Sequence, residues 1–71
     1  MQNKSENFKR ALALQLDGKI KEAQKIYQEL IKENFNNDKL TFLLGTSYLQ
    51  TKDYDKAIDY LNSSIKLNPN L

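Results

Sequence analysis

The sequence contains no cysteine and no histidine, and it has only two glycines and one proline among its 71 residues. Without cysteine there is no disulfide framework and no thiolate chemistry. Without histidine as well, the usual zinc ligands and the commonest general base are missing. A glycine-rich phosphate loop and a nucleophile paired with a base are also lacking, so we expect no catalytic residue, no cofactor and no metal site.

Long hydrophobic runs are absent too. The first ten residues are mostly polar, and the apolar run ALALQL that follows is interrupted by Gln15 and closed by Asp17. We therefore expect neither a signal peptide nor a membrane span, and we take the cytoplasm as the expected location. The net charge of +2 is too small to indicate a nucleic acid or another polyanion as the partner.

What the chain does contain is helical periodicity. Apolar residues make up 39% and charged residues 28% of the sequence, which suits one small, folded, helical domain with a thin core. We predict helices over about 6–16, 19–33 and 39–50, and a fourth that begins after Asp53. The breaks fall at 17–18, where Gly18 suits a left-handed cap, and at 34–37 and 51–53. Asp38 and Asp53 are the expected N-caps of the last two helices.

A shift of the sequence by 34 residues aligns the chain with itself. Within residues 4–37, six residues then meet an identical residue: Phe8 and Phe42, Ala23 and Ala57, Ile31 and Ile65, Lys32 and Lys66, Asn34 and Asn68, Asn36 and Asn70. Small residues also align at Ala11 and Gly45, which is what two closely packed helices need. We therefore divide a single domain, 1–71, into repeat 1, about residues 4–37, and repeat 2, about residues 38–71.

Repeat 2 resembles a tetratricopeptide repeat over its whole length, and repeat 1 resembles one more distantly. In repeat 1, Ala11 stands in place of the family's glycine, Leu14 in place of its tyrosine and Phe35 in place of its proline. The signature residues are Ala11, Leu14, Ala23, Tyr27, Leu44, Gly45, Tyr48, Ala57, Leu61 and Pro69. The resemblance implies an all-α fold in which four antiparallel helices stack as a short right-handed α-solenoid. It also implies a module that binds proteins or peptides and is not an enzyme.

Three sharper functions are disfavoured by the residues present. A clamp for a C-terminal carboxylate, known in this family, would be formed at Phe8, Leu12 and Leu43, and apolar side chains cannot hold a carboxylate. The acidic cluster of Asp53, Asp55 and Asp59 is better explained by helix capping, the helix dipole and solvation than by a metal site. The lysines at 19, 21, 25 and 32 alternate with glutamates, which is typical of a solvated helix face.

The resemblance implies a concave groove lined by the first helix of each repeat. The expected exposed groove residues are Phe8, Leu12, Gln15, Phe42, Thr46 and Leu49, with Lys9, Leu43 and Gln50 at its edge. An alternative is that Phe8 and Phe42 belong to the core, as aromatic residues at helical spacing usually do. The expected ligand is an apolar or amphipathic peptide or helix.

The last helix carries a further apolar stripe that the sequence leaves without an obvious partner. In this family another repeat or a final helix normally covers such a stripe, and here the sequence ends at Asn68-Pro69-Asn70-Leu71. We therefore expect Ile58, Leu61, Ile65 and Leu67 to be only partly covered. Two alternatives remain open: a homodimer through this helix, or a piece of a longer repeat scaffold.

Overall fold

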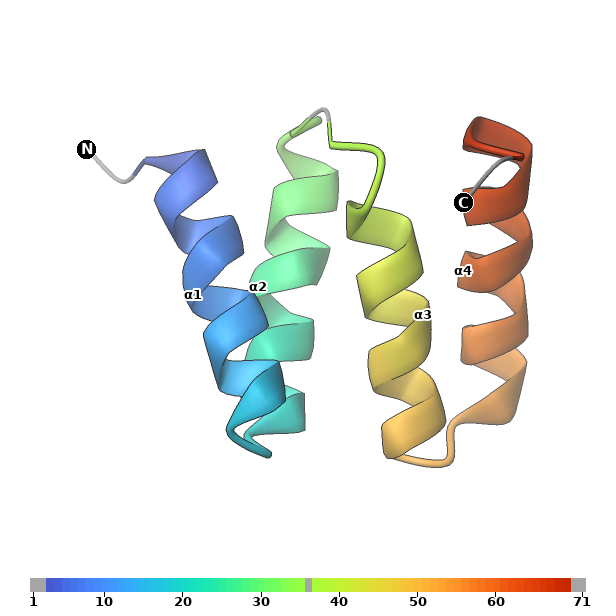
Figure 1. Ribbon diagram of the computed structural model, residues 1–71, viewed down its shortest axis with the longest axis horizontal. Helices are drawn as coiled ribbons and strands as arrows, with labels where there is room; N and C mark the ends of the chain where they lie inside the picture. Colours follow the sequence, from blue (N-terminus) through green and yellow to red (C-terminus); the bar gives the residue numbers. More distant parts are fainter. Residues whose placement is uncertain (1–2, 36, 70–71) are drawn as a thin grey trace.

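The computed structural model describes residues 3–35 and 37–69, and these ranges contain four α-helices and no strand. The helices are α1 (Lys4–Leu16), α2 (Ile20–Lys32), α3 (Leu40–Gln50) and α4 (Tyr54–Leu67). Each runs antiparallel to the helix before it, as Figure 1 shows. The chain therefore folds as the two successive helical pairs that its 34-residue periodicity predicted.

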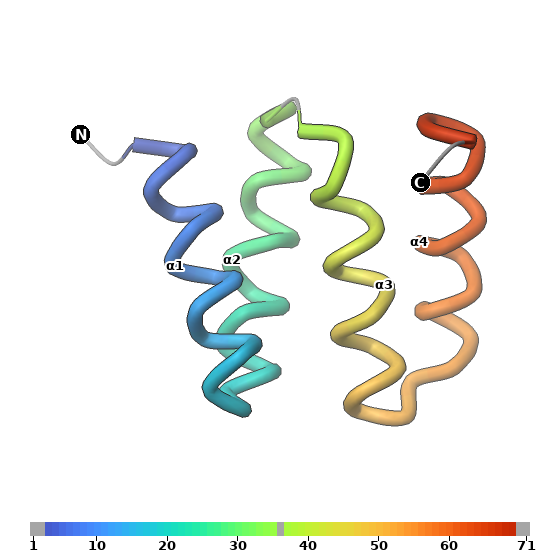
Figure 2. Tube along the Cα trace, in the orientation of Figure 1, coloured from blue at the N-terminus to red at the C-terminus, as the bar shows by residue number. Residues whose placement is uncertain are grey.

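The two helical pairs pack side by side. α1 packs on α2 and α3 packs on α4, while α2 packs on α3 and joins the pairs. α1 also reaches α3, whereas α4 approaches only α3 among the described helices. Figure 2 traces this path, with the α1–α2 and α3–α4 turns at one end of the molecule and the α2–α3 connection at the other.

The turns within the two repeats share one geometry. Gly18 follows α1 with φ of 87°, and the N–H of Lys19 donates to the carbonyl of Leu14 at 2.9 Å. Thirty-four residues later, Lys52 has φ of 64°, and the N–H of Asp53 donates to the carbonyl of Tyr48 at 2.8 Å. Glycine adopts this left-handed conformation without a steric penalty, and lysine does so at a cost. The predicted cap at Gly18 is therefore confirmed.

The first residues of the helices and their N-terminal caps differ in part from those expected. α1 begins two residues early because the side chain of Asn3 accepts the backbone N–H of Ser5 at 2.9 Å. The prediction that Asp38 caps α3 was wrong: Lys39 is the capping residue, and the Asp38 carboxylate accepts from the side-chain amide of Asn68. Asp53 does occupy the cap of α4, but its carboxylate accepts from the Thr51 hydroxyl rather than from the helix backbone.

The core lies between the helices and follows the shared positions of the repeats. Its buried apolar residues are Ala11, Ala23, Tyr27, Leu30, Leu40, Leu44, Tyr48 and Ala57. Gly45 is also buried, Leu14 and Leu61 are half-buried, and Pro69 is exposed. Small residues thus occupy the helix crossings in both pairs, and large residues fill the space around them, which gives the close packing that protein interiors require.

The closest approach in repeat 2 is between α3 and α4 at Gly45. A Cβ atom built on Gly45 would lie 2.9 Å from both Cγ and Cδ2 of Leu61 and 3.3 Å from its backbone nitrogen. The first two distances are well inside van der Waals contact, and the third involves backbone that cannot rotate away. The position therefore needs glycine for packing, although glycine is a poor residue for the interior of a helix.

Replacing Gly45 with alanine is therefore expected to lower the free energy of unfolding, although alanine favours a helix by about 1 kcal/mol over glycine. A Leu61→Ala background removes the two side-chain contacts and leaves only the 3.3 Å approach to the backbone nitrogen, so the same substitution should cost much less there or be stabilising. Urea denaturation of the four proteins measures this coupling. Equal stabilisation by Gly45→Ala in both backgrounds would show that the close approach does not limit stability.

Candidate functional site

α1 and α3 contact each other, and both helices carry apolar side chains that are exposed or half-buried. α1 contributes Leu12, which is half-buried, and Leu16, which is 82% exposed. α3 contributes Phe42 and Leu49, which are 36% and 45% exposed, with the half-buried Thr46 between them. These five residues follow helical spacings of three or four on their helices. We call them the α1–α3 face.

Phe8 was expected either on this face or in the core, and the structure supports the core alternative. It is half-buried and packs against the buried cluster. Its ring centroid lies 6.1 Å from that of Tyr27 and 5.9 Å from that of Phe35. Its repeat counterpart Phe42 is exposed, so the two phenylalanines, equivalent in sequence, differ in environment.

The expectation that Gln15 is exposed was wrong, since only 8% of this residue is accessible. Its side-chain amide donates to Oε1 of Gln50 at 2.8 Å and to the Thr46 hydroxyl at 3.2 Å. Its side-chain oxygen accepts from the hydroxyl of Tyr27 at 2.8 Å. A glutamine whose polar atoms are all partnered can be buried at little cost. The buried side chain of Gln15 therefore links α1 to α2 and α3 by hydrogen bonds.

A second glutamine, Gln24, performs a similar task and was missed by the sequence reasoning. It is 8% exposed, and its amide donates to the backbone carbonyl of Ser47 at 3.2 Å and to the Thr51 hydroxyl at 3.1 Å. Its position one residue after Ala23 and three before Tyr27, on the buried side of the helix, was the signal available in the sequence. The two repeats are thus joined by hydrogen bonds as well as by apolar contact.

Three further residues were expected at the edge of the groove. Lys9 and Gln50 are exposed and Leu43 is half-buried. Leu16 was not expected on this surface at all. The signal for it was its repeat counterpart, Gln50, which the sequence analysis had already placed beside the groove.

A second exposed apolar surface runs along α4. Tyr54, Ile58 and Ile65 are each more than half exposed, and Leu61 is half-buried. They recur at helical spacing on one side of the helix, and we call these four residues the α4 face. The prediction that Ile58 and Ile65 would be incompletely covered is confirmed. Leu67 lies nine residues after Ile58, half a turn away, and lines a separate hollow with Ile31, Phe35 and Leu40.

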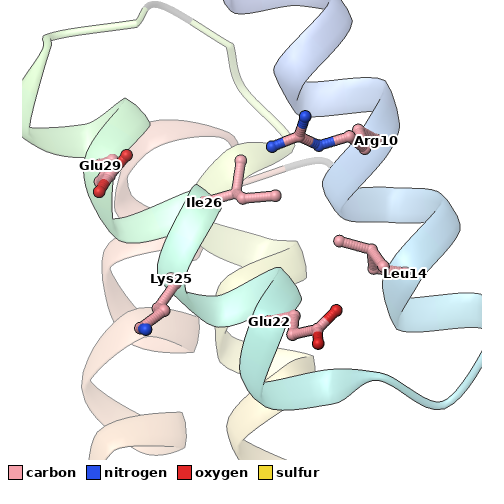
Figure 3. A pocket seen from close by; sticks show the side chains of 6 residues that line it. All are labelled: Arg10, Leu14, Glu22, Lys25, Ile26 and Glu29. Carbon is pink, nitrogen blue, oxygen red and sulfur yellow. The ribbon is translucent and has the colours of Figure 1, made fainter.

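The opposite end of the molecule has a different chemistry. A shallow hollow between α1 and α2 has the half-buried Leu14 and Ile26 in it, as Figure 3 shows. Its other lining residues are charged and exposed: Arg10, Glu22, Lys25 and Glu29. Both signs of charge are present, so the hollow has no preference for an anion or a cation.

The described residues offer little else on which chemistry could be built. Asp53, Asp55 and Asp59 are exposed. Within 3–35 and 37–69 no group of three or more histidine, cysteine, aspartate or glutamate side chains is placed to hold a metal ion. None of the four helices found there has the length and apolar character that a membrane span requires.

The chain belongs to the tetratricopeptide repeat family, which matches it over residues 7–34 and again over residues 41–71. It is 30% identical over 67 residues to the photosystem I assembly protein Ycf3 of Acaryochloris marina (strain MBIC 11017). That alignment covers 90% of this chain and 40% of the relative, so the chain spans less than half of the relative's length. No solved structure matches the chain significantly. The repeats support a role in protein interaction.

The burial of Tyr27 makes the free energy of unfolding depend on pH in the alkaline range. Burial raises the pKa of its hydroxyl to about 12, whereas a tyrosine in an unfolded chain has a pKa of about 10. The stabilising contribution is therefore complete below the unfolded value and is lost as the pH rises toward the folded value, because the unfolded state releases the proton first. Tyr27→Phe carries no such group, so its deficit in unfolding free energy relative to wild type should shrink over this range.

Urea denaturation of both proteins at increasing pH measures that difference. The other tyrosines and the lysines are common to both proteins, so their titration cancels in the comparison. A deficit that stays constant throughout the range would contradict the burial of the Tyr27 hydroxyl.

Proposed function

We propose that this chain is a protein-interaction module whose α1–α3 face binds an apolar or amphipathic segment of a partner protein. The observation that carries the proposal is the exposure of Phe42 and Leu49, two large apolar residues seven positions apart on α3. Exposed apolar residues clustered within a polar surround commonly mark a binding surface. Leu12 and Leu16 lie on α1, which contacts α3, and we propose that they extend the binding surface to repeat 1.

The polar groups of this face suit a peptide better than a charged tail. Thr46 and Gln50 lie beside the leucines, and both are held by the amide of Gln15. Carboxylate ligands would need cationic side chains among the contacting residues, and all five residues of the α1–α3 face are uncharged. We therefore expect affinity to depend weakly on salt, as it does where apolar burial dominates.

The relative supports the same class of function. Its name describes a protein that assists assembly of photosystem I. A repeat module that holds a partner by an apolar face suits a protein that assists assembly, since such a protein needs contacts and no chemistry. We propose binding of a protein partner, and no enzymatic reaction, as the activity of this chain.

The test is to select amphipathic peptides from a library on the immobilised 71-residue protein and to measure their affinity by fluorescence anisotropy at low and high salt. Leu12→Ala and Phe42→Ala should each weaken binding by more than about 1 kcal/mol, because each removes apolar contact area from the ligand. Ile26→Ala is the matched control, since Ile26 is also half-buried but lies in the charged hollow.

Circular dichroism of the same variants separates binding from folding. Loss of binding with helicity retained supports the α1–α3 face. Unfolding of both variants would assign Leu12 and Phe42 to the core, and unchanged affinity in folded variants would place the binding surface elsewhere.

A second candidate function is self-association or stacking within a longer repeat scaffold. The observation that favours it is the α4 face, where Ile58 and Ile65 are 55% and 60% exposed. α4 approaches α3 alone among the described helices, so this apolar side of α4 lies uncovered. We propose a homodimer through the last helix as the specific form of this alternative.

A further inference from the structure

The internal repeat shows what kind of surface the α4 face is. When the sequence is shifted by 34 residues, the four residues of the α4 face align with four residues of α2. The aligned pairs are Tyr54 and Ile20, Ile58 and Gln24, Leu61 and Tyr27, and Ile65 and Ile31. In repeat 1 that side of α2 packs against α3, and Tyr27 is fully buried there. The α4 face is therefore the copy, in repeat 2, of a surface that a helix already covers in repeat 1.

The side chains at this surface nevertheless differ between repeat 1 and repeat 2. In repeat 1, Gln15 and Gln24 donate hydrogen bonds to α3 and to the turn that follows it. Their counterparts in repeat 2 are Leu49 and Ile58, which have no polar side-chain group. A helix that covers the α4 face must therefore be apolar at the contact, because a buried polar group from it would find no partner in these side chains.

The hollow between α1 and α2 does not meet this requirement. Its exposed rim consists of Arg10, Glu22, Lys25 and Glu29. Placing the α4 face of one copy on this hollow would bury charges against isoleucine side chains, which is costly. Head-to-tail stacking of copies is therefore disfavoured. The pairing that covers the α4 face of both copies at once places one α4 face against the other.

The charges beside the α4 face favour the same pairing. Asp55 and Lys66 are both exposed and lie eleven residues apart, which is three helical turns, so they share one flank of α4. In an antiparallel pair of α4 helices related by a two-fold axis near Leu61, Asp55 of each copy lies opposite Lys66 of the other. In the same register Asp59 lies opposite Asn62, so no like charges meet.

We infer that the α4 face binds a second copy of this chain in an antiparallel, two-fold symmetric dimer with two Asp55–Lys66 ion pairs between the copies. This inference rests on the self-association proposed above as the second candidate function. A symmetric pairing buries the same patch on both copies and closes on itself. Tyr54, Ile58, Leu61 and Ile65 supply the apolar centre of this contact.

Charge reversal tests the register through sedimentation velocity of the 71-residue protein. Asp55→Lys and Lys66→Asp each replace two attractive pairs with two repulsive ones, so each should weaken dimerisation by about tenfold or more. An equimolar mixture of the two variants should recover dimers, because every pair between unlike variants is again attractive. Asp59→Lys is the matched control and should leave the dimer nearly unchanged.

The outcomes separate the two proposals. A wild-type protein that stays monomeric at high concentration while fully helical would overturn self-association and the inference together. Dimerisation that is unchanged by both charge reversals, or that the mixture fails to restore, would overturn this antiparallel register and leave self-association supported. Dimer loss in Leu12→Ala with helicity intact would place the contact on the α1–α3 face and also contradict the inference.

Discussion

The buried hydrogen bond between Tyr27 and Gln15 is the contact on which the rest of the structure depends. Tyr27 is fully buried, and its hydroxyl donates to the side chain of Gln15 at 2.8 Å. The amide of the same glutamine reaches Thr46 and Gln50 on α3. One connected set of polar groups therefore spans three helices, within a core whose apolar burial drives folding. Two repeats too small to bury their own surfaces become one packed body.

This arrangement gives the ends of the molecule different properties. Where repeat 1 meets repeat 2, glutamines at positions 15 and 24 fix the contact by hydrogen bonds. At the free end of repeat 2, the equivalent positions hold Leu49 and Ile58, both well exposed. The opposite end is rimmed by charges of both signs. The large apolar residues that are exposed therefore lie mainly on α3 and α4, with Leu16 on α1, whereas exposed charges surround the hollow between α1 and α2.

The order of the helices followed from the sequence because helical periodicity and the 34-residue shift depend on local spacing. Gly18 and the breaks between helices were predictable for the same reason. The buried glutamines were not, since their burial depends on acceptors that α3 and the turn after it supply across 23 or more residues of sequence. Phe8 and Phe42 occupy equivalent sequence positions, yet only Phe8 has Tyr27 and Phe35 beside it. Asp38 is not the cap because α3 begins at Leu40 with Lys39 at the N-cap position, and the side chain of Asn37 accepts the backbone N–H of Lys39.

The most direct test of this account is the free energy of unfolding of Gln15→Leu in two backgrounds. In the wild-type background the substitution leaves the Tyr27 hydroxyl buried without this partner, so a loss on the order of 1–3 kcal/mol is expected. In a Tyr27→Phe background the loss should be much smaller, and Lys9→Ala, at an exposed position of the same helix, should cost no more than about 0.5 kcal/mol. A Gln15→Leu protein as stable as wild type, or an equal loss in both backgrounds, would contradict the account.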